Sequence, residues 1–277
     1  MLNQVMPKIS VIMGIYNCAS TLQEALDSLY SQTYQDFEII LCDDGSKDNT
    51  YELALENQKL HNNIVLLKNP HNMGLNQTLN NCLAVAQGEY IARMDGDDIS
   101  LPTRFEKEIK FLEDHPELSL VSTAMIMFDE QGDWGQTKMI EFPQVNDFID
   151  HSPFFTHAAV MVKRSVYLEV GGYTIGERYL RVEDCHLWYK IYAAGYKGGN
   201  ILEPLYKMRD DRNAAGRRKF QHRLNGIYVA IKGFQMLKMP WYYYIFIVKK
   251  IVLTTIKGLI PSSISDNLRK RKFTSKY

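Results

Sequence analysis

Three aspartates stand within four residues, in the run Asp95-Gly96-Asp97-Asp98. Like charges packed into one loop repel each other unless a cation neutralises them. Mg²⁺ and Mn²⁺ take oxygen ligands, commonly one or two carboxylates together with the oxygens of a diphosphate. Asp95 and Asp97 share one side of the turn and are the predicted metal ligands. The alternative interpretation is a solvated acidic turn, or a helix cap supplied by Asp98.

A second acidic segment, Asp43-Asp44-Gly45-Ser46, follows an apolar, strand-like run. A carboxylate at a strand end can accept hydrogen bonds from a base or a ribose, and Gly45 allows the backbone to turn tightly. The segment also fits a turn in which Ser46 and Asp48 bind free amides at the start of the next helix. The two interpretations are compatible.

The third feature is the pair Glu183-Asp184, which opens an amphipathic stretch with apolar residues at Leu187, Trp188 and Ile191. Such a stripe would hold the start of the helix rigidly. The helix dipole stabilises a carboxylate there as the anion, which keeps it ready to accept a proton from a hydroxyl. Acids are also favoured in a first turn for stability alone.

Elements of alternating type must position these acids. Up to about residue 125, short apolar runs alternate with amphipathic stretches, which is typical of βαβ units around a mostly parallel sheet. Ligands bind such sheets outside the carboxyl ends of the strands, so Asp43-Asp44 and the 95–98 run are expected to face one crevice. The predicted strands are 9–16, 37–42, 64–68 and 89–94. The predicted helices are 20–31, a second helix that ends at about residue 60, and then 75–86 and 102–115. The first of these helices is expected to begin with a capping box.

Beyond residue 125 the alternation weakens. The pattern predicts a strand over 157–164, a helix over 183–194 that Gly195 ends, and a short strand over 197–202.

Composition limits the class of protein. With 277 residues, 45% of them hydrophobic, the chain can bury a sizeable core. The four cysteines stand far apart, which predicts neither a zinc site nor a disulfide framework and suits a reducing cytosol. The N-terminus lacks the pattern of a secretion signal.

The net charge of zero hides an asymmetry. Residues 217–277 contain 14 of the 32 basic residues and only one acid, Asp266, so the preceding part is acidic. This predicts two parts with different partners, residues 1–215 and a basic tail over 216–277.

Several segments together resemble the family 2 glycosyltransferases, which are inverting enzymes with the nucleotide-sugar-binding fold called GT-A. The resemblance covers about residues 7–210. Within the family, the chain most resembles enzymes of bacterial exopolysaccharide and capsule assembly. It implies an α/β fold with a Rossmann-like, mostly parallel sheet flanked by helices. The segments are ISVIMGIYN, SLYSQTYQDFEIILCDDGSKDNT, NPHNMGLNQTLNNCLAVAQGEYIARMDGDD, HAAVMVKRSV and VEDCHLWYKI.

The resemblance also implies roles. Asp97 would be the principal metal ligand, with Gly96 in the turn and Asp95 near the ribose and the metal. Asp184 would be the general base beside Glu183. The nucleotide base would be held by Asp44 and by the end of the first strand, at Gly14, Ile15 and Tyr16.

Other positions match the family less fully. Asn72, Gly74 and Asn80 fall in the donor-pocket stretch, but residues 72–80 contain no Arg or Lys to bind a diphosphate. His157 matches a recurrent histidine beside the active-site floor, although a satisfied core histidine is the alternative. The segment LYKMRDDRN lacks the histidine of many relatives, so no third protein ligand to the metal is implied. Three arginines are candidate diphosphate partners or ordinary surface charges: Arg178, Arg181 and Arg209.

The basic tail mixes apolar, aromatic and lysine residues over 226–261 and ends in RKRK. Lys249-Lys250 interrupt the apolar run, and 241–248 is too short to cross a bilayer. The composition predicts an interfacial helix on anionic lipid, with packing against the acidic body as the alternative. No motif for reading nucleic acid accompanies the basic residues, so a nucleic-acid partner is not expected.

The sequence therefore predicts an inverting glycosyltransferase that uses Mn²⁺ or Mg²⁺ and a nucleotide sugar, with UDP as the expected nucleotide. The expected acceptor is a saccharide or lipid-linked saccharide, and the expected location is the cytoplasm, at the inner face of the cell membrane. Two alternatives stay open: a sugar nucleotidyltransferase, although GIYNCAS is not its Gly-rich loop, and a non-catalytic binding or regulatory protein that retains the fold. The sequence leaves the donor sugar, the linkage and the oligomeric state open.

Overall fold

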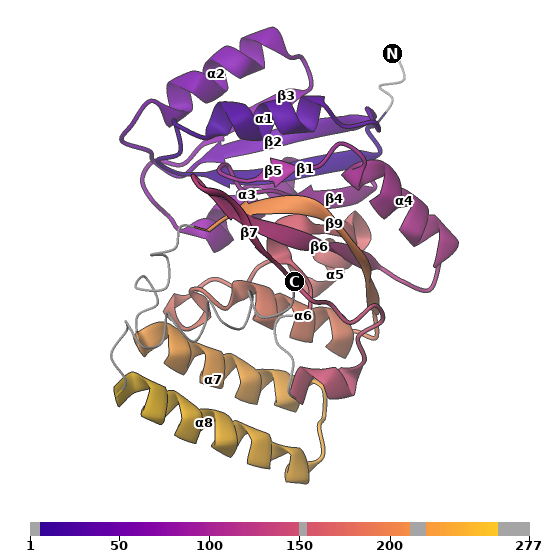
Figure 1. Ribbon diagram of the computed structural model, residues 1–277, viewed down its shortest axis with the longest axis vertical. Helices are drawn as coiled ribbons and strands as arrows, with labels where there is room; N and C mark the ends of the chain where they lie inside the picture. The colour runs from indigo at the N-terminus through magenta and orange to yellow at the C-terminus, as the bar shows by residue number, and fades with distance from the viewer. Residues whose placement is uncertain (1–5, 150–153, 211–219, 260–277) are drawn as a thin grey trace.

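A nine-stranded sheet runs through the protein. The computed structural model describes residues 6–149, 154–210 and 220–259 (Figure 1). The strand order is β3-β2-β1-β4-β8-β6-β9-β5, and β7 pairs with β6. The strands are β1 (Ile9–Ile15), β2 (Phe37–Asp43), β3 (Ile64–Lys68), β4 (Tyr90–Arg93), β5 (Ile99–Ser100), β6 (Leu120–Asp129), β7 (Gly132–Gln136), β8 (Val160–Lys163) and β9 (Gly198–Arg209).

The sheet has a parallel half and a mixed half. The strands β3, β2, β1 and β4 are parallel, as predicted for strands joined by crossover helices. Beyond β4, β8 is antiparallel to both β4 and β6, whereas β6 and β9 are parallel. The carboxyl ends of β1, β2 and β4 therefore lie along one edge, where the acidic segments begin.

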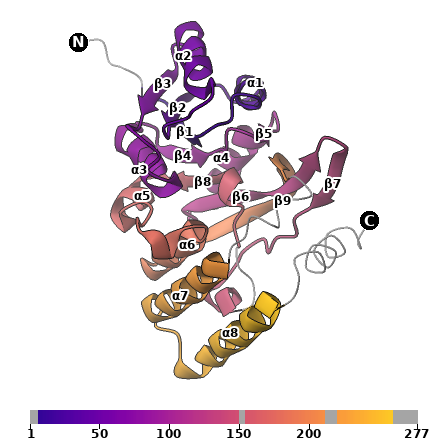
Figure 2. The same ribbon diagram turned by 90° about the vertical axis from the view of Figure 1, so that its left-hand side faces the viewer.

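Helices cover both faces of the sheet (Figures 1 and 2). Alternate residues of β1 point to opposite faces, so Ile9, Val11 and Met13 join one core cluster and Ile12 the other. The first cluster includes residues of α1 (Leu22–Tyr30), α2 (Thr50–Leu60) and α4 (Arg104–Asp114), and the second those of α3 (Leu75–Val85), α5 (Arg164–Val170) and α6 (Glu183–Ala193).

The strand predicted over 157–164 is corrected by the structure. The chain forms a 3-10 turn at His157–Ala159, in which the Ala159 amide donates to the Thr156 carbonyl at 3.0 Å. The strand β8 occupies only Val160–Lys163, and α5 follows it directly. An apolar run with β-branched residues does not reveal this turn, because the turn depends on a local backbone bond.

Two long strands were missed or shortened in the sequence interpretation. The predicted strand 197–202 continues to Arg209 as β9, and β6 over Leu120–Asp129 was not predicted as a strand. These two strands pair along most of their length with register shifts, so neither shows the regular alternation expected of a strand.

The predicted capping box at the start of α1 does not form. Thr21 makes no side-chain bond to the helix amides. Its hydroxyl donates instead to the carbonyl of Cys18 at 3.2 Å and to that of Gly96 at 3.0 Å. The residue that was expected to cap a helix therefore ties that helix to the acidic turn.

Two further helices, α7 (Phe220–Met236) and α8 (Tyr244–Leu259), follow α6 as successive layers in both views. A short 3-10 turn at Trp241–Tyr243 joins them. Within α7, Val229, Ala230 and Phe234 are buried, and Asn225 donates to the carbonyls of Glu177 at 2.9 Å and Leu180 at 3.2 Å. For α7, packing against the body is therefore what the structure shows.

Among the described residues, every helix is too short or too polar to span a membrane. The boundary placed near residue 215 and the RKRK run lie outside the described residues.

The contact between α7 and α6 gives a first prediction. A Cβ at Gly233 would lie 2.3 Å from Cγ of Tyr189. Overpacking costs about 1–3 kcal/mol, which outweighs the gain of about 1 kcal/mol from Ala over Gly in a helix. We expect Gly233→Ala to lower the free energy of unfolding in a denaturant titration.

Gly226→Ala is the matched control in the same helix. There a Cβ would meet only Cγ1 of Val182, at 3.8 Å, so stability should hold or rise. Equal effects of the two variants would contradict the close contact between α6 and α7.

Candidate active site

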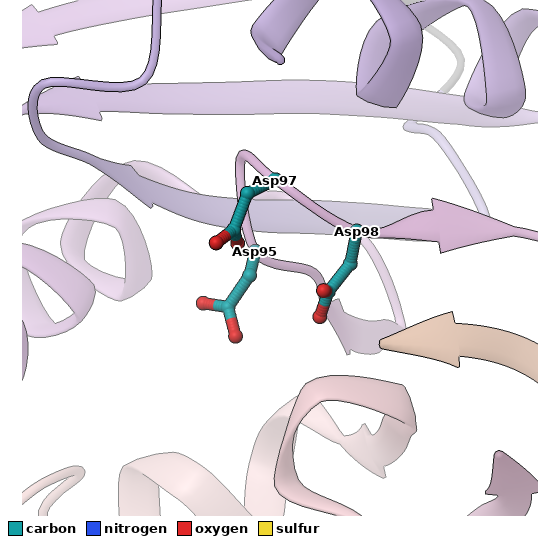
Figure 3. Close-up of side chains that lie close together, drawn as sticks. All are labelled: Asp95, Asp97 and Asp98. Atoms are coloured by element: carbon teal, nitrogen blue, oxygen red, sulfur yellow. The ribbon is translucent and has the colours of Figure 1, made fainter. Parts of the chain in front are cut away.

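The acidic turn lies between β4 and β5. One carboxylate oxygen from each of Asp95, Asp97 and Asp98 falls within 4.8 Å of the others. Figure 3 shows the carboxylates of Asp95 and Asp97 side by side, with Asp98 where the chain enters β5. Asp97 is exposed, Asp95 half-buried and Asp98 buried. A set of close carboxylate oxygens fits a hard divalent cation, and Asp97 and Asp95 are the members open enough to bind one.

Close packing sets the position of the turn. A Cβ at Gly96 would lie 2.9 Å from Sγ of Cys18 and 3.2 Å from Cγ2 of Ile15, so only glycine lets the turn approach the end of β1. On the other side, the Asp95 amide donates to the Tyr206 hydroxyl at 3.2 Å. The turn is therefore held between β1 and β9.

Arg93, the last residue of β4, supplies a fixed positive charge beneath the turn. Its side chain is 4% exposed and donates from Nη2 to Oδ1 of Asp95. Its carbonyl accepts a hydrogen bond from Nη2 of Arg104 at 3.0 Å. The sequence interpretation did not include Arg93 because its place inside a buried strand gave no local sign of an ion pair. An arginine two residues before Asp95, at the end of an apolar run, was the available signal.

Burial and neighbouring charges shift the pKa values of Asp97 and Asp98. Desolvation and the charge of Asp95 raise the pKa of Asp97 to about 6, while Arg93 opposes the shift. Burial, followed by Asp95 and Asp97, raises the pKa of Asp98 well above its ordinary value. Oδ1 of Asp98 accepts the Arg209 amide proton at 2.8 Å. Asp98 thus joins the turn to β9 rather than offering itself to a ligand.

Asp44 lies at the end of β2 and connects two loops. It accepts hydrogen bonds from the Met73 amide at 2.7 Å and the Gly74 amide at 2.9 Å. Asn69 adds a third bond through its side chain, at 2.8 Å. The carboxylate therefore fixes the loop that leads into α3 from a distant part of the chain. This structural role accompanies the predicted contact with a nucleotide base.

The remaining residues predicted for the nucleotide lie beside Asp44. The Asp44 amide donates to the Ile15 carbonyl at 2.9 Å, which places the Gly14–Tyr16 segment next to it, with the Tyr16 side chain 43% exposed. Asn72 is exposed, and its backbone nitrogen would lie 2.9 Å from a Cβ at Gly45. The structure brings these residues to one strand edge.

The structure confirms the turn interpretation for Asp48, which binds an amide at the start of α2, but not for Ser46, which binds an amide that follows β1. Asp48 accepts the Thr50 amide proton at 3.1 Å and the Ala19 amide proton at 3.1 Å. The Ser46 hydroxyl accepts the Asn17 amide proton at 3.0 Å. The second acidic segment is thus a turn fastened to the end of β1.

Glu183 and Asp184 form the first turn of α6, as predicted. Burial and then Asp184 raise the pKa of Glu183 to about 7, while Arg93 and Arg181 lower it. Burial raises the pKa of Asp184, opposed by the hydrogen bond from the Cys185 amide at 2.7 Å and by Arg93. Because Arg93 also acts on Asp97, the two acidic sites lie within electrostatic reach of the same guanidinium.

His157 lies on the floor of this region. Its Nε2 is 2.8 Å from the hydroxyl of Tyr173, and its ring meets that of Trp188 edge-on, with centroids 6.1 Å apart. Burial lowers the pKa of His157 well below its ordinary value, and Arg93 adds to this shift. His157 is therefore neutral at pH 7 and acts there as a hydrogen-bonding group.

Asn80, in the donor-pocket stretch of the sequence, holds the protein backbone. It donates to the Tyr173 carbonyl and accepts from the Tyr173 amide, both at 2.8 Å. Nearby, a cavity of about 230 Å³ opens between the start of α3, at Gly74 and Gln77, and the loop from Ile175 to Leu180 that leads into α6.

The three candidate arginines have different surroundings. Nε of Arg209 donates to the Asp97 carbonyl at 3.0 Å, and its Nη2 pairs with Glu24. The guanidinium of Arg178 lies over the Tyr228 ring, 5.5 Å from its centroid. Arg181 is exposed and has a φ of 64°, directly before α6. The structure thus places Arg209 at the acidic turn and Arg181 beside Glu183, whereas Arg178 packs on α7.

A pH-dependent prediction follows from Glu183. A carboxyl group whose pKa is about 7 when folded, against an ordinary 4.5, binds its proton more tightly in the folded state. This contribution to stability is complete below about 4.5 and is lost as pH rises through about 7. Glu183→Gln should therefore stabilise the protein at pH 8 by about 1–3 kcal/mol and change little at pH 5.

Thermal and denaturant unfolding at both pH values would measure the difference. Glu177→Gln, at an exposed acid in the preceding loop, is the control and should change the free energy of unfolding at neither pH. A gain from Glu183→Gln that is equal at pH 5 and pH 8 would refute the raised pKa.

Comparison with known proteins agrees with this geometry. The model of the family Glycosyl transferase family 2 matches residues 10–180. The predicted glycosyltransferase EpsE of Bacillus subtilis is 38% identical over 267 residues, which are 96% of this chain and 94% of that protein. An Escherichia coli relative, UDP-Gal:alpha-D-GlcNAc-diphosphoundecaprenol beta-1,3-galactosyltransferase, is 34% identical over 218 residues, or 76% of this chain and 78% of that protein.

Solved structures share the fold. A TarS fragment from S. aureus in complex with UDP-GlcNAc has a TM-score of 0.65 at 17% identity, covering 83% of this chain and 70% of that one. The mannosyltransferase PcManGT from Pyrobaculum calidifontis, in complex with GDP-Man and Mn²⁺, has a TM-score of 0.63 at 20% identity, covering 98% of this chain and 82% of that one. These likenesses confirm the predicted GT-A architecture. With the family model matched over more than half of its length, the chain belongs to glycosyl transferase family 2.

Proposed function

We propose that this protein transfers a sugar, with inversion, from a nucleotide diphosphate donor to a hydroxyl of a saccharide or lipid-linked saccharide. UDP is the proposed nucleotide, and Mn²⁺ or Mg²⁺ the proposed metal. The observation that carries the proposal is the arrangement around Arg93. One buried guanidinium pairs with Asp95 of the acidic turn and lowers the pKa values of Asp97, Glu183 and Asp184.

The names of similar proteins support the substrate classes. The Escherichia coli relative is named for a UDP-sugar donor and a diphosphoundecaprenol-linked acceptor. Among the structures of like fold, one contains UDP-GlcNAc and another GDP-Man with Mn²⁺. The proposed acceptor and localisation, at the cytoplasmic face of the membrane, extend these names to the present chain. The proposed catalytic part is residues 1–215, and the basic tail is the proposed membrane contact.

Each residue of the site has a task in the proposed reaction. Asp44 and the Gly14–Tyr16 segment would bind the nucleotide base at the edge of β1 and β2. Asp97 and Asp95 would hold the metal, which when bound neutralises charge on the diphosphate. Arg93 holds Asp95 in place for this purpose.

Asp184 would accept the proton of the acceptor hydroxyl. The oxygen would then attack the anomeric carbon from the side opposite the diphosphate, and a single displacement of this kind inverts the configuration. His157, which is neutral, can orient a hydroxyl but holds no charge to offer a phosphate.

A donor-hydrolysis assay tests the proposal. The purified full chain is incubated with a panel of UDP-sugars and with Mn²⁺, Mg²⁺ or EDTA, and released UDP is measured. We expect metal-dependent UDP release from one or a few donors. Pyrophosphate release from a nucleoside triphosphate and a sugar phosphate would identify a nucleotidyltransferase instead. Cation-dependent UDP binding without turnover, even with saccharide acceptors, would indicate a binding protein.

A further inference from the structure

The outward side of α8 is apolar and exposed. Trp241, just before the helix, is 84% exposed, and Ile245, Val248 and Val252 within it are 63%, 52% and 51% exposed. Steps of three and four residues put these side chains on one side of the helix. We call these four residues the outer face of α8. Folded proteins rarely leave such a large apolar group uncovered unless it meets a partner.

A different side of α8 holds the helix to the body. Ile247 is 5% exposed, and the ring of Tyr244 meets that of Phe234 on α7 edge-on, with centroids 5.7 Å apart. Since α7 in turn packs on α6, the direction of the outer face is set by the fold. Figures 1 and 2 both show α8 as the outermost layer beyond α7.

Charge distinguishes among the possible partners. Lys249 and Lys250 are exposed in the same stretch, and residues 212–265 contain no Asp or Glu. A symmetric dimer through this face would bring Lys249, which flanks it, near the Lys249 of the second copy, with no acid in this stretch to pair with them. An anionic bilayer accepts both groups, because apolar side chains enter the acyl boundary while lysine ammonium groups reach the phosphates.

We propose that the outer face of α8 lies in the plane of an anionic membrane, buried to the depth of its headgroups. This proposal rests on the proposed function only for the side of the membrane and for a lipid-linked acceptor. Trp241 and its neighbour Tyr242 would sit at headgroup level, where amphipathic rings are favoured. The helix, with 16 residues and two central lysines, is suited to lying on the surface.

The proposal has a consequence for the acceptor. Packed helices are about 8–10 Å apart, so the catalytic pair at the start of α6 would stand roughly 20 Å from the axis of α8. An acceptor hydroxyl must reach that height. A lipid whose reacting sugar is raised by a polar headgroup, such as a diphosphate, meets this requirement better than a lipid alcohol.

Vesicle sedimentation of the full chain tests the contact. We expect binding to vesicles of phosphatidylcholine with phosphatidylglycerol and much weaker binding to phosphatidylcholine alone. Ile245→Ser with Val248→Ser should weaken binding to the mixed vesicles about tenfold or more. Lys249→Gln with Lys250→Gln should weaken it roughly tenfold, and only on anionic vesicles.

Leu60→Ser and Leu202→Ser are the matched controls, because these leucines are 78% and 50% exposed on other elements. Both variants should bind vesicles like the parent chain. Loss of binding in the controls as well would show that general surface apolarity, not α8, governs the interaction, and would overturn the proposal.

Fluorescence locates the contact. Brominated lipids should quench Trp241 emission, and Trp241→Phe should remove that quenching while vesicle binding remains. Light scattering tests the competing outcome. If the parent chain is a dimer that binds no vesicles, and Ile245→Ser with Val248→Ser dissociates that dimer, the face is assigned to a second copy. UDP release by the same variants in solution, without vesicles, separates a failed membrane contact from a failed catalytic assignment.

Discussion

Asp184→Asn is expected to lower kcat for sugar transfer about 10²–10⁴-fold, the range contributed by a positioned general base. The side chain stands in the first turn of α6, half-buried, with Trp188 fully buried one turn further along. Asparagine keeps the shape and can still accept the Cys185 amide bond. It cannot take up the proton of the acceptor hydroxyl. The donor Kd should therefore stay close to that of the parent chain, and the melting temperature should not fall.

The measurement needs steady-state transfer with an acceptor and, separately, donor binding by calorimetry. Glu183→Gln provides the neighbouring comparison: it removes a charge from the same turn but keeps Asp184, so it should cost less activity. Transfer by Asp184→Asn at the parental rate would remove Asp184 from the role of base. A matching loss of donor binding would instead show that Asp184 belongs to the donor site.

Asp97→Asn should abolish most of the cation-dependent affinity for UDP and lower kcat/KM about 10²–10³-fold, as expected when a group that stabilises developing charge is lost. Asp97 is the exposed member of the acidic turn, and desolvation together with the charge of Asp95 raises its pKa to about 6. A bound cation would relieve that repulsion. The neutral amide of asparagine is a weaker ligand and leaves fewer charges to neutralise.

Mn²⁺ titrations followed by electron paramagnetic resonance, with and without UDP, would measure this loss directly. Asp133→Asn is the control, because Asp133 is a surface acid paired with Lys207 at 2.9 Å. Asp98→Asn should behave differently: Asp98 is buried against β9, so its replacement should change stability more than metal affinity. Unchanged Mn²⁺ dependence of UDP binding in Asp97→Asn would show that the metal is held elsewhere.

The importance of Arg93 follows from these two sites. Its guanidinium is buried, pairs with Asp95 and lowers the pKa values of Asp97, Glu183 and Asp184. A fixed positive charge in this place lets several acids stand close together before any metal arrives. The same charge adds to the effect of burial, which lowers the pKa of His157.

Local patterns were sufficient for the first half of the fold. Residues 9–115 alternate between β-branched runs and amphipathic stretches, and the strands and helices predicted there are present within a few residues. A parallel sheet joined by helices brings its strand ends to one edge, so the nearness of Asp44 to the first strand and the position of the acidic turn could be expected. The Glu183-Asp184 pair was also predicted at the start of a helix, and it begins α6.

Partners distant in the sequence were decided by the tertiary structure alone. Asp44, just after β2, accepts the amide protons of Met73 and Gly74 directly before α3, and Tyr206 on β9 accepts the Asp95 amide proton. The composition of the tail could not show which helix packs and which is exposed, because α8 is the more apolar of the two and yet the more exposed. Burial and hydrogen-bond partners depend on which surfaces meet in space, and local residue patterns record only how each surface is made.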